Sequence, residues 1–562
     1  MKRTVSQSDA PAAKRSRTTQ DTPKVLDTSV VTGQVAESDE SLPESLEEVG
    51  ATHDNPRGVD LKAVARWHAS VTGNPLKMMA KNAITTIGRT LSTMSSEQIN
   101  LISYLFAHSI KRDHVRATDQ AQSGRCWMFA GLNMFRHPLI NQLKLRDFEF
   151  SQTYLFFWDK LERANSYLTW FINERARGGE IDFTSREFDW ENSKLLSDGG
   201  DWNTLVNLIL KYGLVPKSAM KETWQSSDSE DMNELIISHL NSAAFKIASR
   251  KSADGSVDGA IAPSAFARLK AQTMRKVYDA LVIFLGVPPK QFEWSYTMSR
   301  SDLDESELSP SHTDNDLVCQ TAPMAPSRFS AMIPFDLVKD FVHLANITTN
   351  PFEMGRMYHW IASSNVVDGV EAIFLNTSMH VMERAILKSL GMGMGVYMAA
   401  DMAHGFNMYH SVLDDQLEQS DAIFERVAPL NKSIKAHFGG MHMHAMCITG
   451  VNLDEAGRVK NFQVENSWGY VDNDVPGMDG FLVMTRQWFL DHVTDVVVHR
   501  KCLTRAVLKA TEQEPVSVKP WDYNEHQVFF KGLVRKPAGY LARMASGVAS
   551  GVASGVASSS GK

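Results

Sequence analysis

The sequence predicts an α+β fold, and two local patterns support this prediction. Apolar residues recur at helical spacing between Leu61 and Trp67, which is typical of an amphipathic helix. Much later, residues 441–450 and 459–464 form two apolar runs separated by a turn at 454–457, a pattern that predicts a β-hairpin. Mixed helix and strand signals fill the chain between these two regions, so the fold combines both classes of element.

The composition is that of a large globular protein. The chain has 562 residues, of which 43% are hydrophobic and 22% charged, so it holds several domains' worth of material and can bury a large core. Acidic residues outnumber basic ones by 65 to 58, for a net charge of -7. This balance argues against a globally basic nucleic-acid-binding protein, although a local basic arm is compatible with it.

Cysteine usage and hydropathy indicate the compartment. The four cysteines, at positions 126, 319, 447 and 502, are too few and too scattered for a disulfide framework, which favours a reducing environment. No stretch approaches the roughly 18 to 20 apolar residues that span a bilayer, and the first residues lack the apolar core of a signal peptide. We therefore expect a cytoplasmic protein without a membrane partner, with the nucleus as the open alternative.

Three regions are expected along the chain. Residues 1–57 form an arm rich in Ser, Thr, Asp, Glu and Pro, which we expect to be disordered because little burial offsets the entropy of ordering it. The basic clusters at 2–3 and 14–17 resemble a bipartite nuclear-import signal, and a solvated basic tail is an equal alternative. Residues 58–522 form the folded body. Residues 523–562 form an extension ending in a low-complexity Ala/Ser/Gly/Val tail.

Softer stretches interrupt the folded body. Residues 252–263 and 299–323 are rich in Ser, Asp and Pro, and we expect both to be surface loops between subdomains. The methionine-rich stretch 392–398 is expected to be a buried strand rather than a ligand-binding motif.

The segment 120–130 carries the strongest chemical signal. A polar loop containing Gly124 leads into an apolar run that can stay helical until Pro138, which places Cys126 at a helix N-terminus. The unsatisfied N–H groups there favour a thiolate. The backbone N–H of Cys126 and the side chain of Gln120 can donate to an oxyanion. The alternative is a buried cysteine that only fills the core, and at this point it is equally favoured.

The predicted hairpin supplies the partners of such a thiol. It brings His444 on one strand close to Asn466 at the end of the next. An amide oxygen that accepts from one ring nitrogen fixes the tautomer and leaves the other nitrogen for the thiol. Trp468 is placed to shield this hydrogen bond from water. His437, His442 and His444 also suggest a metal site, but no carboxylate or cysteine set completes it, so no metal or other cofactor is expected.

Together, the segments 120–127, 444–445 and 465–469 resemble the papain-like cysteine peptidases, and 123–127 resembles their bleomycin hydrolase branch. The resemblance covers most of 58–521. It implies a papain-like fold with large helical and hook-type insertions, because the interval from Cys126 to His444 far exceeds the roughly 130 to 150 residues of a minimal domain. By resemblance, the site residues are the nucleophile Cys126, the base His444, the orienting Asn466, the oxyanion donor Gln120 and the substrate-binding Gly199, Gly200 and Trp468.

The resemblance also implies an activity and an assembly. The expected protein is a cysteine peptidase, an aminopeptidase acting on peptides and related amides, that forms a homohexamer. One departure bears on specificity. Members of the family end soon after the segment that residues 520–522 resemble, whereas here forty residues follow Asp522. An endopeptidase with an open cleft is therefore an alternative. The basic stretches 14–17 and 531–536 support a second alternative, a nucleic-acid-binding or scaffold protein on a peptidase fold.

Overall fold

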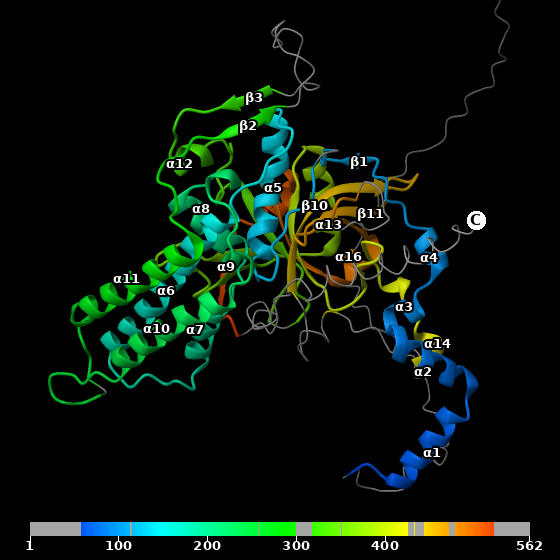
Figure 1. The fold of residues 1–562 in the computed structure, drawn as a ribbon, viewed down its shortest axis with the longest axis horizontal. Helices are drawn as coiled ribbons and strands as arrows, with labels where there is room; N and C mark the ends of the chain where they lie inside the picture. Colours follow the sequence, from blue (N-terminus) through cyan, green and yellow to red (C-terminus); the bar gives the residue numbers. More distant parts are fainter. Residues whose placement is uncertain are drawn as a thin grey trace, which may run out of the picture. The chain divides into compact units, whose positions relative to one another are not determined.

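The structure, a computed structural model, describes most of the expected folded body (Figure 1). The described residues are 58–112, 115–257, 259–298, 317–349, 351–424, 432, 443–470 and 478–521. The arm expected at 1–57 and the extension expected at 523–562 lie outside them, as do His437 and His442. The chain divides into two compact units, Met1–Met78 and Met79–Lys562, and each is taken by itself below.

The first unit contains the helix predicted near Leu61. Helix α1 spans Leu61–Thr72, and the carboxylate of Asp60 accepts from the backbone N–H of Lys62 at 2.9 Å to cap its first turn. Only Ala63 is buried in this helix, whereas Leu61 and Trp67 are 81% and 54% exposed. The apolar spacing is therefore helical as predicted, but the apolar face is uncovered within this unit. The boundary between the units falls inside α2, Pro75–Ile87.

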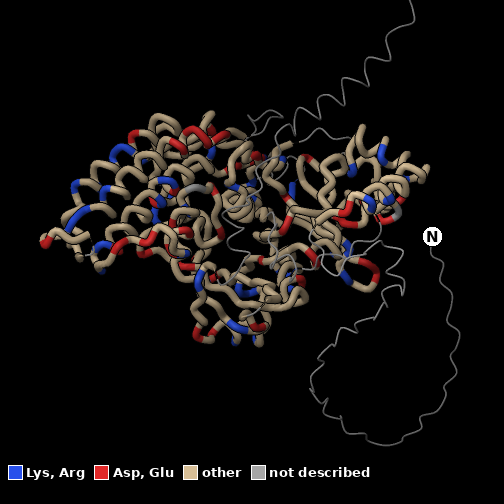
Figure 2. Tube along the Cα trace, turned by 90° about the horizontal axis from the view of Figure 1, so that it is seen from below, with Lys and Arg blue, Asp and Glu red and all other residues tan. Residues whose placement is uncertain are grey.

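A group of helices makes up much of the second unit. Helices α6, α10 and α11 pack against one another as a bundle (Figure 1). The longest, α6, begins where Ser151 accepts from the N–H of Tyr154 and ends at Gly178, whose φ of 84° is the left-handed conformation that favours glycine. Basic and acidic residues are interspersed along these helices (Figure 2). Their bounds are α6 Gln152–Arg177, α7 Arg186–Leu196, α8 Trp202–Tyr212, α9 Trp224–Ser227, α10 Glu230–Ala248 and α11 Ala267–Leu285.

Helix α5, Cys126–Gln142, connects the helical group with the sheet. Fourteen of its residues are buried, from Cys126 at its start to Ile140 near its end. The helix predicted to stop before Pro138 instead continues past it, with Pro138 inside the last turns. Pro138 costs one backbone hydrogen bond, but burial of the next two residues, Leu139 and Ile140, offsets that loss.

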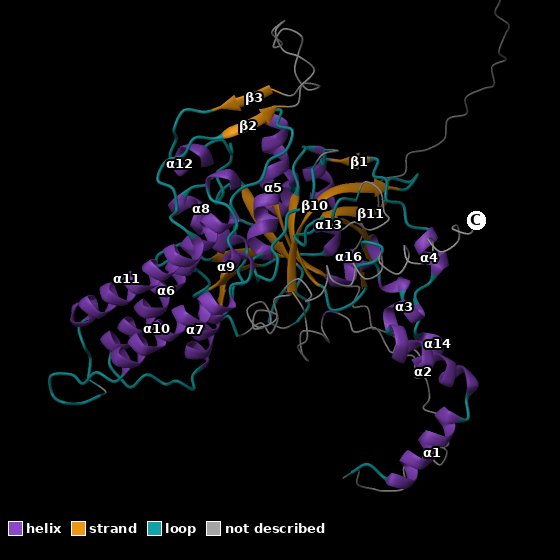
Figure 3. Ribbon diagram, viewed as in Figure 1, coloured by secondary structure: helices purple, strands orange, loops and turns teal. Residues whose placement is uncertain are grey.

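A long mixed sheet makes up another large part of the second unit, and helices α5, α13 and α16 pack against it (Figure 3). Its strand order is β14-β5-β6-β4-β13-β7-β10-β11-β12-β9-β8, with β1 paired to β10. The strands are β1 His108–Ser109, β4 Phe341–Ala345, β5 Met357–Trp360, β6 Ala372–Asn376, β7 Val396–Asp401, β8 Phe406–Asn407, β9 Val412–Leu413, β10 Met443–Leu453, β11 Val459–Glu465, β12 Phe481–Thr485, β13 Val493–His499 and β14 Val516–Val518. The helices that accompany them are α3 Arg89–Thr93, α4 Ser96–Asn100, α12 Pro326–Ser330, α13 Met379–Gly391, α14 Asp421–Phe424, α16 Arg486–His492 and α17 Arg505–Ala510.

The hairpin predicted from the sequence is confirmed. Strands β10 and β11 pair antiparallel across the turn at 454–457, where Asp454 accepts from the N–H groups of Ala456 and Arg458 and Gly457 has a φ of 76°. Strand β10 is buried along most of its length because β7 and β11 flank its edges and α5 packs against it. This central position fixes the strand that carries His444.

Two predicted segments differ from the structure. Part of the loop expected at 299–323 is strand β3, Leu317–Gln320, which pairs antiparallel with β2, Ser295–Met298. The short strand has polar neighbours in sequence, so its pairing partner rather than its own composition decides its conformation. The strand expected at 392–398 begins only at Val396, because Met392 caps the C-terminus of α13 and Gly393 forms the turn that follows. Residues 252–257 and 259–262 lie outside helices and strands, as expected, whereas Pro263 begins a 3-10 helix, Pro263–Phe266.

Candidate active site

Cys126 is the first residue of α5, as predicted, and its side chain is buried. Its N-cap, Arg125, makes no side-chain hydrogen bond to the first turn. The backbone N–H groups of Ala445, Trp127 and Cys126 itself all lower the pKa of the thiol, but burial has the larger effect and raises that pKa to about 11. The N–H groups at the helix start thus act in the predicted direction while desolvation opposes them, and a thiolate at Cys126 stays a prediction.

His444 and Asn466 meet at the end of the hairpin. The Nε2 of His444 lies 2.7 Å from Oδ1 of Asn466. The same Oδ1 accepts from the backbone N–H of Ser467 at 2.8 Å, which identifies it as the amide oxygen. Nε2 must therefore carry a hydrogen, and Nδ1 holds the free lone pair. Nδ1 is buried and has no hydrogen-bond partner among the described residues.

The imidazole and the thiol share a water-poor environment. His444 is 1% exposed, and burial lowers the pKa of its imidazole to about 4, although the contact with Asn466 acts in the opposite direction. The sulfur of Cys126 lies at the backbone N–H of Ala445, the residue that follows His444 on β10. Burial therefore disfavours a lone charge on either group.

Trp468 covers the ring of His444. The two ring centroids lie 5.0 Å apart at an angle of 37°, and Trp468 is 2% exposed. Phe406 packs edge-on against Trp468, with the ring centroids 5.2 Å apart. The aromatic pair keeps water away from the contact between His444 and Asn466, as the sequence predicted for Trp468. A substrate contact for Trp468 stays a prediction.

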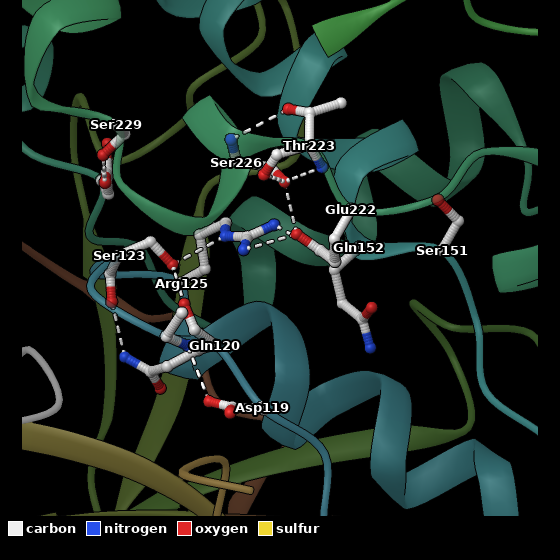
Figure 4. Close-up of polar contacts among 12 residues, drawn as sticks. Asp119, Gln120, Ser123, Arg125, Ser151, Gln152, Glu222, Thr223, Ser226 and Ser229 are labelled. Carbon is white, nitrogen blue, oxygen red and sulfur yellow. Dashed lines mark hydrogen bonds and ion pairs between the residues drawn. The ribbon is translucent and has the colours of Figure 1, made fainter. Parts of the chain in front are cut away.

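Gln120 lies buried in the loop before α5. Its Oε1 accepts from the hydroxyl of Ser467 at 2.6 Å, and its Nε2 donates to the carbonyl of Ser123 at 2.6 Å. Its backbone N–H also donates to the carbonyl of Ser467 at 2.9 Å. These contacts fix the orientation of the amide and use one of its two hydrogens in the described structure. Figure 4 shows Gln120 beside Ser123 on this loop.

The predicted substrate-binding glycines lie in the loop between α7 and α8. Gly199 and Gly200 are both buried. A Cβ on Gly200 would come within 2.7 Å of the indole of Trp127, the second residue of α5. The indole N–H of Trp127 also donates to the carbonyl of Asp198 at 2.8 Å. This close packing of the loop against the start of α5 explains the small residue at position 200, and a substrate contact for either glycine stays a prediction.

Asp198, beside these glycines, forms a buried ionic cluster under the same helix start. Its carboxylate lies 2.6 Å from the ammonium group of Lys160 and accepts from the side chains of Ser229 and Asn233. Burial opposes ionisation, but Lys160 and these donors outweigh it and hold the pKa of Asp198 below its usual range. The backbone N–H of Gly124 points to the same carboxylate at 3.4 Å. The sequence predicts no role for Asp198, because its ionic partner Lys160 lies far from it in the chain.

Glu465 is a further buried carboxylate near the site, with no role predicted from the sequence. It is 1% exposed, and its carboxylate lies 2.9 Å from Nη1 of Arg136 and 2.7 Å from Nε2 of His137. Arg136 and His137 lie on α5, so Glu465 ties the helix that begins at Cys126 to the strand that precedes Asn466. One feature of the sequence does indicate such a contact. Arg136 and His137 stand within an otherwise apolar run, and basic side chains that are buried with it require a buried partner.

The described residues do not support a metal site. No group of three His, Cys, Asp or Glu side chains in the described ranges is arranged to hold an ion, and His437 and His442 lie outside those ranges. All four cysteines are free. No helix in the described part of the chain is long and apolar enough to span a bilayer.

Comparison with known proteins assigns the chain to a family. The Peptidase C1-like family matches residues 58–524. Aminopeptidase C of Listeria monocytogenes is 33% identical over 422 residues, 75% of this chain and 88% of that protein. Human bleomycin hydrolase is 28% identical over 471 residues, 83% of this chain and 98% of that protein. The crystal structure of PepW from Lactobacillus rhamnosis HN001 superimposes with a TM-score of 0.72 at 26% identity, and the match covers 83% of this chain and 99% of PepW.

The α+β fold, with a buried thiol at a helix start beside a histidine and an asparagine on one hairpin, is that of a papain-like cysteine peptidase. More narrowly, the chain belongs to the Peptidase C1-like family.

Proposed function

We propose that this cysteine peptidase is an aminopeptidase whose site is formed by Cys126, His444, Asn466 and Gln120. The observation that carries the proposal is the 2.7 Å contact between His444 and Asn466, because His444 lies on β10, whose Ala445 N–H meets the thiol of Cys126. The relatives named aminopeptidase C and bleomycin hydrolase support the same activity.

Acylation begins with a proton transfer. Nδ1 of His444 takes the thiol proton of Cys126 as the sulfur forms a bond to the carbonyl carbon of the substrate. The transfer creates a negative oxygen and an imidazolium together, which suits a site where burial disfavours either charge alone. Asn466 accepts the hydrogen on Nε2 throughout and so keeps the ring oriented. The second amide hydrogen of Gln120 and the N–H of Cys126 donate to the oxyanion.

The rest of the cycle returns the site to its starting state. The carbon–nitrogen bond breaks as His444 gives its proton to the leaving amine, which leaves a thioester on Cys126. A water molecule then attacks the thioester while His444 takes one of its protons. When the carbon–sulfur bond breaks, the sulfur of Cys126 regains that proton and the acid product leaves.

Specificity for N-termini is proposed to come from the C-terminal segment. Trp521, the last described residue, packs against Trp190, Ala399 and Met443. Met443 immediately precedes His444 on β10, so the chain continues from a point beside the catalytic strand. We propose that a carboxylate of this segment binds the ammonium group of a peptide. The forty residues after Asp522 favour one alternative, an endopeptidase whose cleft the longer segment leaves open.

The assembly and compartment are also proposals. We propose a homohexamer from the resemblance to the bleomycin hydrolase branch. We propose the cytoplasm, with the nucleus as alternative, because all four cysteines are free. Size-exclusion chromatography with light scattering tests the first proposal, and a monomer would contradict it. The nucleic-acid alternative rests on basic stretches outside the described residues.

The activity is tested by mass spectrometry of the products of one peptide, offered with a free and with an acetylated N-terminus. Wild-type protein is compared with Cys126→Ala, which controls for contaminating peptidases. Stepwise loss from the free N-terminus, prevented by acetylation and absent in the variant, is the expected result. Internal cuts that acetylation does not affect would replace the aminopeptidase proposal with the endopeptidase alternative. Equal turnover by wild type and Cys126→Ala would contradict both.

A further inference from the structure

A buried arginine lies directly beside the candidate nucleophile. Arg125 has no exposed surface, and its guanidinium lies over the rings of Phe129 and Phe156, 5.2 Å and 5.0 Å from their centroids. Its Nη2 lies 2.9 Å from the carboxylate of Glu222 (Figure 4). Its Nε donates to the hydroxyl of Ser123 at 2.8 Å. A charged group without solvent needs such partners, so this geometry is tightly constrained.

The direction of the Ser123 hydroxyl follows from Arg125. A guanidinium can only donate, so the oxygen of Ser123 must accept from it and turn its own hydrogen elsewhere. That hydrogen goes to the backbone carbonyl of Gln120 at 2.6 Å. In return, the side-chain amide of Gln120 donates to the backbone carbonyl of Ser123 at 2.6 Å. Two reciprocal hydrogen bonds therefore close the loop 120–123 around the proposed oxyanion donor.

The segment that contains Glu222 holds this loop at a second point. The hydroxyl of Ser226 donates to the Glu222 carboxylate at 2.5 Å, and the carbonyl of Ser227 accepts from the N–H of Gln122 at 2.8 Å. Burial opposes ionisation of Glu222, but Arg125 and Ser226 outweigh it and lower its pKa. The loop is thus fixed to the segment 222–227 by one ion pair and one backbone hydrogen bond.

We propose that Glu222, Arg125 and Ser123 are positioning residues that hold the amide of Gln120 at the oxyanion. This inference rests on the proposed function, in which Gln120 stabilises the oxyanion. Removing the Ser123 hydroxyl frees one side of the closed loop while leaving Cys126, His444 and Asn466 untouched. A displaced donor costs transition-state stabilisation, because a shift of about 1 Å can lower a rate by about 100-fold.

The test compares Ser123→Ala with Gln120→Ala and with the double variant. Ser389→Ala is the matched control, because Ser389 is also buried and donates to a backbone carbonyl, that of Met394, at 3.1 Å. For Ser123→Ala we expect kcat to fall by about 10- to 100-fold with little change in KM. Adding Ser123→Ala to Gln120→Ala should lower kcat by less than about threefold, because the donor is already gone.

Two further readouts separate positioning from general damage. A peptide aldehyde binds by forming an oxyanion with Cys126, so its inhibition constant should rise in Ser123→Ala by the same factor as kcat falls. Alkylation of Cys126 by iodoacetamide creates no oxyanion, so its rate should stay within about twofold of wild type. Ser389→Ala should leave both values unchanged even if it lowers the melting temperature.

The outcomes are distinguishable from failure of the proposed function. Wild-type kcat in Ser123→Ala together with a loss in Gln120→Ala overturns the positioning role and leaves the oxyanion role intact. Losses that multiply in the double variant also overturn it, because the two residues then act independently. Wild-type kcat in Gln120→Ala overturns the oxyanion role itself, and the positioning inference with it.

Discussion

Replacing Glu465 should destabilise the protein far more than replacing another carboxylate on the same arginine. Glu465→Gln removes a charge that is 1% exposed and that contacts both Arg136 and His137. Breaking a buried ion pair typically costs about 3 to 5 kcal/mol, because it leaves an uncompensated charge in the core. In the variant, Arg136 still donates to the backbone carbonyls of Phe148 and Arg116. We therefore expect the free energy of unfolding to fall by about 3 kcal/mol.

Asp147→Asn is the matched control. Asp147 lies 2.9 Å from Nη2 of Arg136, the same distance that separates Glu465 from Nη1, but its side chain is 56% exposed. Solvent screens such a pair, so its loss should cost less than about 1 kcal/mol. The assay is equilibrium urea unfolding followed by tryptophan fluorescence, with both variants at the same pH and salt. Equal losses in the two variants would refute the argument that burial decides the strength of this contact.

Three other predictions follow from the packing and charges of the site. Gly200→Ala brings a Cβ within 2.7 Å of Trp127 and should cost about 1 to 3 kcal/mol; Gly391→Ala, where nothing lies within 4 Å, should not lower the melting temperature. Because burial lowers the pKa of His444 from 6.5 to about 4, the unfolded chain binds a proton in that window that the folded chain does not. Wild type should therefore lose up to roughly 3 kcal/mol of stability as the pH falls from 6.5 to 4, and His444→Gln should lack this loss; parallel stability curves would contradict it. Gln120→Ala should lower kcat by about 100- to 1000-fold in a peptide hydrolysis assay, with a smaller effect on KM, and an unchanged kcat would count against its role.

Much of the site could be predicted from local sequence. A polar loop running into an apolar helix places Cys126 at the helix start, and the two apolar runs around the turn at 454–457 define the hairpin. Within that hairpin, the positions of His444 and Asn466 near the joined strand ends follow from register alone. These features depend on residues close in sequence, so periodicity and turn chemistry are enough to place them.

The tertiary structure decided which polar groups are buried and with what partners. The ion pairs of Arg125 with Glu222 and of Glu465 with Arg136 join residues far apart in the chain, and nothing in the local pattern of either residue names its partner. The same holds for the ionisation of Cys126. The helix N-terminus predicts a lowered pKa, whereas the surrounding protein raises it by excluding water. Sequence determines the helix and the hairpin because these form from neighbouring residues, while desolvation and buried pairing arise only when distant segments pack together.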